Sequence, residues 1–435
     1  MRVADPPDCR WVGTTTAPEG ERSHEPAVGR DVQVLVINSG SSSIKFELFA
    51  MDPERALLSG EVERVGQPDA RLWVEASGSD AGRTEAPVDA RDHGEAMRAV
   101  LGALDSAPAP VDLRDVVAVG HRVVHGGTRF IEPTRVDDDV LDAIRELELL
   151  APVHIKANVA GIEAARATFP DVSHIAVFDT AFHHTLPPVA REYALPAALA
   201  RAHGIRRYGF HGTSHGYVAR CAAEMLGRPL SELNLITLHL GNGASVCALR
   251  GGQSIDTSMG MTPLEGLVMG TRCGDVDPAI PGLLGELVDV SREEINRMLN
   301  FESGLKGLCG EGDMREVHRL IAEGDPDAAL ARDLYCYRAK KYVGSYLAVL
   351  GRVDAIVFTA GVGENDADVR ARICAGLERF GIELDASRNA APPNADSAER
   401  SIGADGAEVA VLVIPTDEER EIARAAYRCL HLVHD

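Results

Sequence analysis

The chain has 435 residues, of which 45% are hydrophobic and 25% charged, and these values are ordinary for a globular protein. This length predicts two domains rather than one. The net charge of −22 disfavours binding to nucleic acid or to an anionic membrane surface. No stretch approaches the roughly 20 apolar residues of a membrane span, and the N-terminus lacks the apolar core of a secretory signal. If the ligand is an anion, the cations that bind it must therefore gather in one cleft.

The eight cysteines are scattered along the chain and form no C-x-x-C pair. Such a pattern is typical of reduced thiols that fill core space in a cytoplasmic protein. It predicts a cytoplasmic location and disfavours a structural zinc site.

Taken in chain order, residues 1–31 are rich in Pro, Gly, Thr, Glu and Arg and show no hydrophobic periodicity, which predicts a disordered extension. Order is expected from residue 32, and 34–49 reads as strand, Gly/Ser turn and strand. A similar unit follows at 235–249, with Gly40 and Gly243 separated by 203 positions. Two such hairpins, at the starts of two halves of similar size, suggest a duplicated domain.

Further apolar strands alternate with helix-like segments between and after these hairpins. We expect strands at 116–119, 174–178, 355–359 and 410–414, and helices over segments such as 138–150 and 331–350. This alternation indicates an α/β fold with a largely parallel or mixed sheet. Two longer connections, around 66–92 and 386–404, are predicted to be surface insertions.

Glycine-rich turns are the candidate phosphate-binding loops. The sequence has no G-x-x-x-x-G-K-[ST], which disfavours a P-loop kinase. The turns 39–43 and 241–245 could instead cradle a phosphate with backbone N–H groups, and Lys45 could add a charge beside the first. Plain hairpin turns are an equal alternative. A third turn, 361–365, follows a predicted strand, where open α/β sheets bind nucleotides.

Two arginines and several histidines are candidate binding groups. Arg122 and Arg272 lie among glycines and apolar residues, and a guanidinium there suits a carboxylate or phosphate ligand. A structural ion pair is the alternative for each. His211 and His215 lie four positions apart and could bind zinc if a helix begins there. The sequence lacks a third ligand at a recognisable spacing, which disfavours zinc.

Eight motifs in order resemble the acetate kinase family over residues 32–435: VLVINSGSSSIKF, HRVVHGG, FDTAFH, YGFHGTSH, HLGNGAS, DTSMGMTPLEGLVMGTRCGD, GVGEN and IPTDEE. The resemblance implies an α/β fold of two duplicated ribonuclease H-like, actin-like ATPase domains with a nucleotide cleft between them. It implies domains at 32–183, completed by a C-terminal helix at 420–435, and at 184–419. It also implies ATP and acetate as substrates, Mg²⁺ with Mn²⁺ possible, and a homodimer.

The resemblance further implies a role for each residue that matches a family motif. Asn38 and Glu418 would hold the metal ion. Asp179 would be the catalytic carboxylate, and His211 and Arg272 would stabilise the transition state. The substrate would be bound by Arg122, Val124, Val153 and Pro263. ATP would be bound by Lys45, His239, Leu240, Gly241, Asn242, Gly243, Asp313, Met314, Arg315, Gly361, Val362, Gly363, Glu364 and Asn365.

One departure from the family pattern concerns specificity. The chain reads Val153-His154-Ile155-Lys156 where the family usually has Leu-His-Asn-Pro. Valine removes one methylene from the implied methyl pocket, and one methylene discriminates between substrates by only about 1–3 kcal/mol. Propionate or another short-chain acid is therefore the alternative substrate. The Ile-Lys pair also puts the placement of His154 in question.

The implied chemistry explains why cationic groups dominate the site residues that the resemblance implies. A carboxylate with a pKa near about 3.9 is already ionised at neutral pH and needs no strong base. Asp179 is therefore predicted to orient an arginine or a metal-bound water. A pyrophosphate-using relative is disfavoured by the GVGEN turn, and an inactive relative by the complete set of charged residues. An Hsp70-like binding module would need an attached peptide-binding domain, which we do not expect here.

Overall fold

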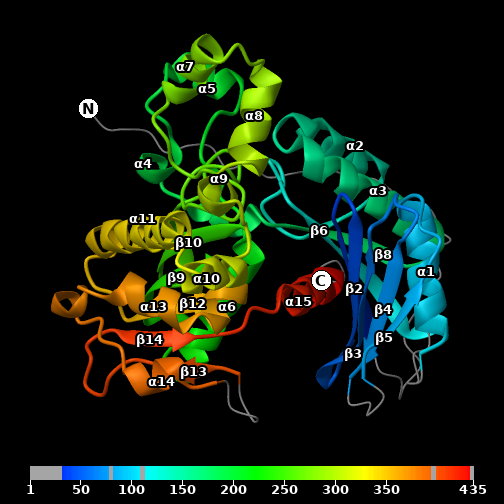
Figure 1. The fold of residues 1–435 in the computed structure, drawn as a ribbon. Helices are drawn as coiled ribbons and strands as arrows, with labels where there is room; N and C mark the ends of the chain where they lie inside the picture. Colours follow the sequence, from blue (N-terminus) through cyan, green and yellow to red (C-terminus); the bar gives the residue numbers. More distant parts are fainter. Residues whose placement is uncertain (1–31, 78–81, 108–112, 393–397, 432–435) are drawn as a thin grey trace, which may run out of the picture.

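The computed structural model describes residues 32–77, 82–107, 113–392 and 398–431. The predicted disordered extension, 1–31, lies outside the described residues. Two mixed β-sheets with helices packed on them form two lobes, and helix α15 (Glu418–His431) lies between the sheets (Figure 1). The predicted α/β class is confirmed.

The first sheet has eight strands in the order β5-β4-β3-β2-β1-β6-β8-β7. Strand β1 pairs antiparallel with β2 and parallel with β6, and β6 pairs parallel with β8. The strand bounds are β1 Gln33–Ser39, β2 Ser43–Met51, β3 Glu54–Glu63, β4 Arg71–Ala76, β5 Thr84–Pro87, β6 Val116–Val123, β7 Thr134–Arg135 and β8 Ser173–Phe178.

The second sheet has six strands in the order β11-β10-β9-β12-β14-β13. Its bounds are β9 Asn234–Leu240, β10 Ala244–Arg250, β11 Gln253–Thr257, β12 Ala355–Thr359, β13 Arg400–Ser401 and β14 Ala410–Val413. The order β3-β2-β1-β6-β8 of the first sheet thus recurs as β11-β10-β9-β12-β14, with the same antiparallel and parallel pairings. The two predicted hairpins open equivalent sheets, which confirms the duplication inferred from their turns.

The helices cover both faces of each sheet. Their bounds are α1 His93–Asp105, α2 Asp138–Glu146, α3 Pro152–Thr168, α4 Pro188–Arg191, α5 Ala197–Ala202, α6 Gly212–Leu226, α7 Ile280–Leu287, α8 Arg292–Phe301, α9 Gly304–Cys309, α10 Met314–Ala322, α11 Pro326–Leu350, α12 Ala360–Asn365, α13 Ala367–Cys374, α14 Ala386–Ala390 and α15 as given. The predicted helix 331–350 is the greater part of α11, which begins earlier because Asp325 caps it and Pro326 occupies its first position.

The predicted helix 138–150 was too long. Helix α2 ends at Glu146 and is followed by the 3₁₀ turn Leu147–Leu149. Helix α3 begins at Pro152, and a proline excludes the residue before it from the α region. Ala151 accordingly has φ −150° and ψ 68°, so the chain must leave the helix before this point.

Both predicted surface insertions are largely exposed, but the expectation that they are plain connections was wrong. Residues 66–92 contain β4 and β5, which extend the first sheet, and Leu72 and Val74 pack against its core. Residues 386–404 contain α14 and β13, and Asn389 is buried there. The predicted glycine-rich turn 361–365 was also wrong in form, because those residues lie in helix α12. The polar composition of these segments gave no sign of their strands and helices. A strand or helix needs only one apolar face to pack against the core.

Helix α15 returns the chain to the first sheet. It contacts β1, β2, β6 and β8, and Ile422, Ala423 and Ala426 are buried against Val34 and Val36. On the opposite face of the sheet, α3 packs on β1, and α1 packs on β2 and β3 (Figure 1). The predicted C-terminal helix, 420–435, therefore begins two residues earlier than expected, and 432–435 lie outside the described residues. The domain limits of 32–183 and 184–419 remain predictions.

All seven cysteines in the described ranges are free, and Cys221, Cys247, Cys336 and Cys374 are buried. Cys9 lies outside these ranges. Within the same ranges, none of the helices has the length and apolar character needed to cross a lipid bilayer.

Candidate active site

Two neighbouring parallel strands bring Arg122 and Asp179 together. Arg122 lies near the end of β6, and Asp179 directly follows β8. The guanidinium donates from Nε to Asp179 Oδ1 at 3.0 Å and from its terminal nitrogen to Oδ2 at 2.8 Å. Asp179 is 1% exposed, so this forked pair is shielded from water. The structural ion pair considered for Arg122 is therefore present.

Glu418, at the start of α15, approaches the same guanidinium. Its Oε2 lies 3.5 Å from the terminal nitrogen of Arg122. Burial raises the pKa of the Glu418 carboxyl, and the charges of Arg122 and Lys45 oppose that rise. Asn38, at the end of β1, donates to Glu419 Oε1 at 3.5 Å. The two predicted metal ligands thus lie in one region with Lys45, and their oxygen donors suit Mg²⁺.

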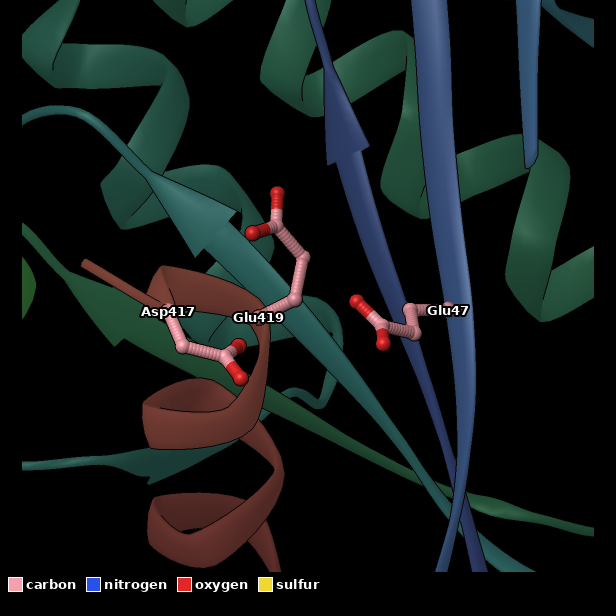
Figure 2. Close-up of side chains that lie close together, drawn as sticks. All are labelled: Glu47, Asp417 and Glu419. Atoms are coloured by element: carbon pink, nitrogen blue, oxygen red, sulfur yellow. The ribbon is translucent and has the colours of Figure 1, made fainter. Parts of the chain in front are cut away.

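A cluster of three carboxylates beside this region was missed in the sequence. Glu47 projects from β2, Asp417 directly precedes α15, and Glu419 lies in the first turn of that helix (Figure 2). Oxygens of all three lie within 4.8 Å of one another, and the three line a cavity of about 620 Å³. Within the described ranges, this is the only group of three such side chains close enough to share a metal ion. The acidic run 417–419 was the available signal, but its partner on β2 depended on the fold.

The shifted pKa of the Glu47 carboxyl makes the stability of the folded protein depend on pH. Burial, followed by the charges of Asp417 and Glu419, raises the pKa of Glu47 from 4.5 to about 8. A raised pKa in the folded state contributes stability at low pH that is lost as the pH rises from about 4.5 to about 8. Glu47→Gln should therefore raise the melting temperature at pH 8.5 and change it little at pH 5.

Thermal melts in buffer containing a chelator measure this effect without bound metal. Glu75→Gln, on the exposed edge of β4, is the matched control and should show no pH-dependent gain. An equal shift for Glu47→Gln at both pH values would contradict the charge argument.

Two stacked imidazoles lie next to the Arg122–Asp179 pair. His211 precedes α6 with φ 57°, and its ring stacks on that of His239 with centroids 4.1 Å apart. The stack lies close to Asp179, because Gly212 N donates to Asp179 O at 3.0 Å. A Cβ on Gly212 would lie 2.2 Å from that oxygen, so only glycine fits. Burial lowers the pKa of His211 well below its usual value and that of His239 to about 4, so both rings are neutral at pH 7.

The zinc alternative for His211 and His215 is not supported by the geometry. The two rings are directed at the same Ser245 hydroxyl, at 2.8 Å from His211 Nδ1 and 2.9 Å from His215 Nε2. His215 Nδ1 lies 2.7 Å from Thr237 Oγ1. Of the candidate metal-binding groups in the described part of the chain, none includes either histidine.

Arg272 differs from Arg122 in having no acidic partner among the described residues. It donates to Pro263 O at 3.0 Å, and no carboxylate of a described residue lies within ion-pair distance. Burial lowers its pKa from 12.5. The loop around it is held by Arg207, which donates to the carbonyls of Thr257, Ser258 and Met259 and to Glu265. A structural ion pair therefore does not explain Arg272, and its charge is left for a ligand.

The β9–β10 turn brings His211 and Arg272 together. A Cβ on Gly243 would lie 3.4 Å from His211 Nε2 and 3.6 Å from a terminal nitrogen of Arg272. The glycine therefore leaves both donor groups next to the backbone of the turn. One imidazole and one unpaired guanidinium at a turn rich in N–H groups form a site suited to phosphate oxygens.

Most of the predicted ATP residues gather around the same turn. A Cβ on Gly270 would lie 2.0 Å from Asn242 Oδ1 and 2.7 Å from Gly312 O, so the turn touches the segment before Asp313. On its other side, a Cβ on Gly241 would lie 3.7 Å from that of Ala360, the first residue of α12. Lys45 lies instead on β2, beside Glu418.

Side-chain hydrogen bonds fix the start of α10 and the end of α12. Asp313 caps α10 and pairs with Arg315 at 2.5 Å, leaving the Arg315 side chain 89% exposed. Arg370, missed in the sequence, is 1% exposed and donates to the carbonyls of Gly363 and Glu364 at 2.9 Å. Arg370 therefore holds the predicted nucleotide-binding helix in place.

The predicted acyl pocket is described in part. Val124 is partly buried and packs against the core of the second lobe, and Pro263 accepts a hydrogen bond from Arg272. The side chain of Val153 lies outside the described residues, although its backbone is the second residue of α3. Burial, then the charges of Arg272 and Arg122, lower the pKa of His154. His154 therefore lies near both arginines, in the segment where the sequence departs from the family pattern.

Comparison with known proteins agrees with this geometry. The profile of the Acetokinase family matches residues 33–424. The chain belongs to the acetokinase family. It is 54% identical over 398 residues to the acetate kinase of Leifsonia xyli, covering 91% of this chain and 98% of that one. It is 54% identical over 400 residues to the acetate kinase of Syntrophobacter fumaroxidans, with 90% and 96% covered.

Solved structures of acetokinases share the fold. The crystal structure of Porphyromonas gingivalis acetate kinase matches with a TM-score of 0.85 and 40% identity, covering 92% of this chain and 99% of that one. A propionate kinase from Francisella tularensis also matches with a TM-score of 0.85, at 39% identity and 91% and 99% coverage. Fold similarity therefore does not separate the two substrates.

Proposed function

We propose that this protein is an acetate kinase, which reversibly transfers the γ-phosphoryl group of ATP to acetate and forms acetyl phosphate and ADP. The observation that carries the proposal is that His211 and Arg272 meet at the β9–β10 turn, with Arg122 near enough for its charge to lower the pKa of His211. The protein is acidic overall, yet this site gathers cations and neutral N–H donors. They lie where the two anionic substrates, ATP and acetate, must meet. The full-length curated relatives named acetate kinase support the same reaction.

The chemistry requires no general base. A carboxylate oxygen of acetate attacks the γ-phosphorus, the bond to the bridging oxygen breaks, and ADP leaves with that electron pair. Arg122 binds the acetate carboxylate, and Asp179 holds the Arg122 guanidinium in orientation. Arg272 and His211 donate to the oxygens of the transferred group, where charge changes during transfer.

Asn38 and Glu418 would hold Mg²⁺, or Mn²⁺ in its place, which supplies positive charge to the ATP phosphates. The ATP phosphates and nucleoside would be bound by the turn and helix residues His239 to Gly243, Asp313 to Arg315 and Gly361 to Asn365, with Lys45 reaching from β2. The gathering of these segments around Gly241 and Gly270 supports this arrangement.

Propionate is the second candidate substrate. The propionate kinase structure resembles this chain as closely as the acetate kinase structure does. Val124, Val153 and Pro263 are the proposed pocket for the acyl chain. Because valine is one methylene shorter than the leucine usual in the family at position 153, we expect propionate to be a competent substrate.

We also propose a cytoplasmic homodimer whose only other partners are small molecules. Large apolar side chains on and beside α7 support self-association, because Leu283, Leu287 and Val288 are 50%, 69% and 54% exposed. The net charge of −22 argues against nucleic acid or an anionic membrane as a partner.

A hydroxylamine trap for acyl phosphate tests the function. Purified protein is supplied with MgATP and acetate, propionate or butyrate in parallel. We expect the strongest signal with acetate and loss of that signal in Arg122→Ala and Arg272→Ala. A preference for a longer acid would keep the chemistry and change the substrate, and no signal with any acid would overturn the proposal.

A further inference from the structure

A chain of hydrogen-bonding side chains leads from the interior of the second lobe to His211. Thr237 Oγ1 lies 2.7 Å from His215 Nδ1, His215 Nε2 lies 2.9 Å from Ser245 Oγ, and Ser245 Oγ lies 2.8 Å from His211 Nδ1. Thr237, His215 and Ser245 are each 0% exposed. They come from β9, α6 and β10, which pack together in this lobe.

The number of hydrogens limits how this chain can be arranged. Burial lowers the pKa of both His211 and His215 well below the usual value, so each ring is neutral and carries one N–H. Ser245 has one hydroxyl hydrogen and lies between the two rings. It must donate to one imidazole and accept from the other. Only two arrangements of the whole chain are therefore consistent, and they place the His211 proton on different nitrogens.

Thr237 decides between the two arrangements. Among the described residues, its hydroxyl has a single side-chain or backbone partner, His215 Nδ1. If Thr237 accepted from His215, its own hydrogen would be buried without an acceptor, which is unfavourable. Thr237 therefore donates to His215 Nδ1. His215 Nε2–H then donates to Ser245, and Ser245 donates to His211 Nδ1.

We propose that Ser245, which bonds His211 directly, and Thr237, which acts through His215 and Ser245, are positioning residues that hold neutral His211 with its proton on Nε2. That nitrogen is the one next to the β9–β10 turn, 3.4 Å from where a Cβ of Gly243 would lie. His211 then presents an N–H donor to an oxygen of the transferred phosphoryl group. The other tautomer would direct a lone pair at the same anionic oxygen, which repels it. This inference rests on the proposed phosphoryl transfer.

The protonated nitrogen can be observed without any assay of activity. Long-range ¹H–¹⁵N correlation spectra of protein labelled at histidine distinguish Nε2–H from Nδ1–H, and His211→Gln assigns the signal. We expect Nε2–H for His211 in the protein without ligands at pH 7. A proton on Nδ1 would overturn the inference. Because the spectrum needs no substrate, this outcome is separate from failure of the hydroxylamine trap, which would count against the proposed function.

Variants of Thr237 test whether this chain of hydrogen bonds matters for turnover. Thr237→Val keeps the side-chain shape but removes the hydroxyl, so we expect an Nδ1–H population at His211 and a fall in kcat of about tenfold or more. The KM values for acetate and ATP should change little, and Thr237→Ser should restore kcat. Thr257→Val is the matched control, since the hydroxyl of this buried threonine of β11 bonds, among the described residues, Val246 O alone. An unchanged tautomer and kcat in folded Thr237→Val would overturn the proposed role of Thr237.

Discussion

Asp179→Asn should lower kcat for acyl phosphate formation about 10³-fold or more, by the same proportion at every pH at which the protein is folded. Asp179 is 1% exposed and accepts both arms of the Arg122 fork. Asparagine replaces one of the two acceptor oxygens with an NH2 donor, which would face an N–H of Arg122 in place of an acceptor. Arg122 would then be free to turn toward Glu418, whose Oε2 is already 3.5 Å away, and would no longer hold acetate in line.

The pH profile separates this orienting role from proton removal. If Asp179 were a general base, the loss in Asp179→Asn would shrink at high pH or with a less basic acid such as fluoroacetate. That result in the hydroxylamine trap would contradict the orienting role. Asp171→Asn, at an exposed aspartate before β8, is the control and should retain full activity.

Arg272→Ala should lose activity as severely as Asp179→Asn but should remain stably folded. An arginine that stabilises the charge of a transferred phosphoryl group contributes about 10³–10⁵ in kcat. Arg272 has no carboxylate partner in the described part of the chain, so its removal leaves no buried acid uncompensated. We expect an unchanged or higher melting temperature together with the loss of kcat.

Arg122→Ala should behave differently in the same melt. Its removal leaves Asp179 and Glu418 close together without their shared cation, which should lower the melting temperature. Added guanidinium should restore part of the activity of Arg272→Ala, because the site around Pro263 is intact. If Arg122→Ala and Arg272→Ala lowered the melting temperature equally, the inference that only Arg122 compensates buried carboxylates would be contradicted. Arg319→Ala, on the exposed face of α10, is the control.

Local sequence patterns were sufficient to predict those strands and turns whose structure depends on their own residues. The apolar runs around Val36 and Leu238, each ending in a Gly/Ser turn, predicted the two hairpins and therefore the duplication. The motifs also singled out Arg122, Asp179 and Arg272, because these positions match motifs of the acetate kinase family. Polar segments were read less well, since β4, β5 and α12 depend on the surfaces against which they pack.

The sequence by itself determined the fold class, the family and the inventory of charged and imidazole groups, because these depend on residue type and local order. The tertiary structure alone decided how those groups are paired. It gave Arg122 two carboxylates and left Arg272 with none, it set Glu47 against Asp417 and Glu419, and it linked Thr237 to His211. Partners of this kind lie far apart in the chain, and only the packing of β-strands and helices sets their distance, burial and charge state.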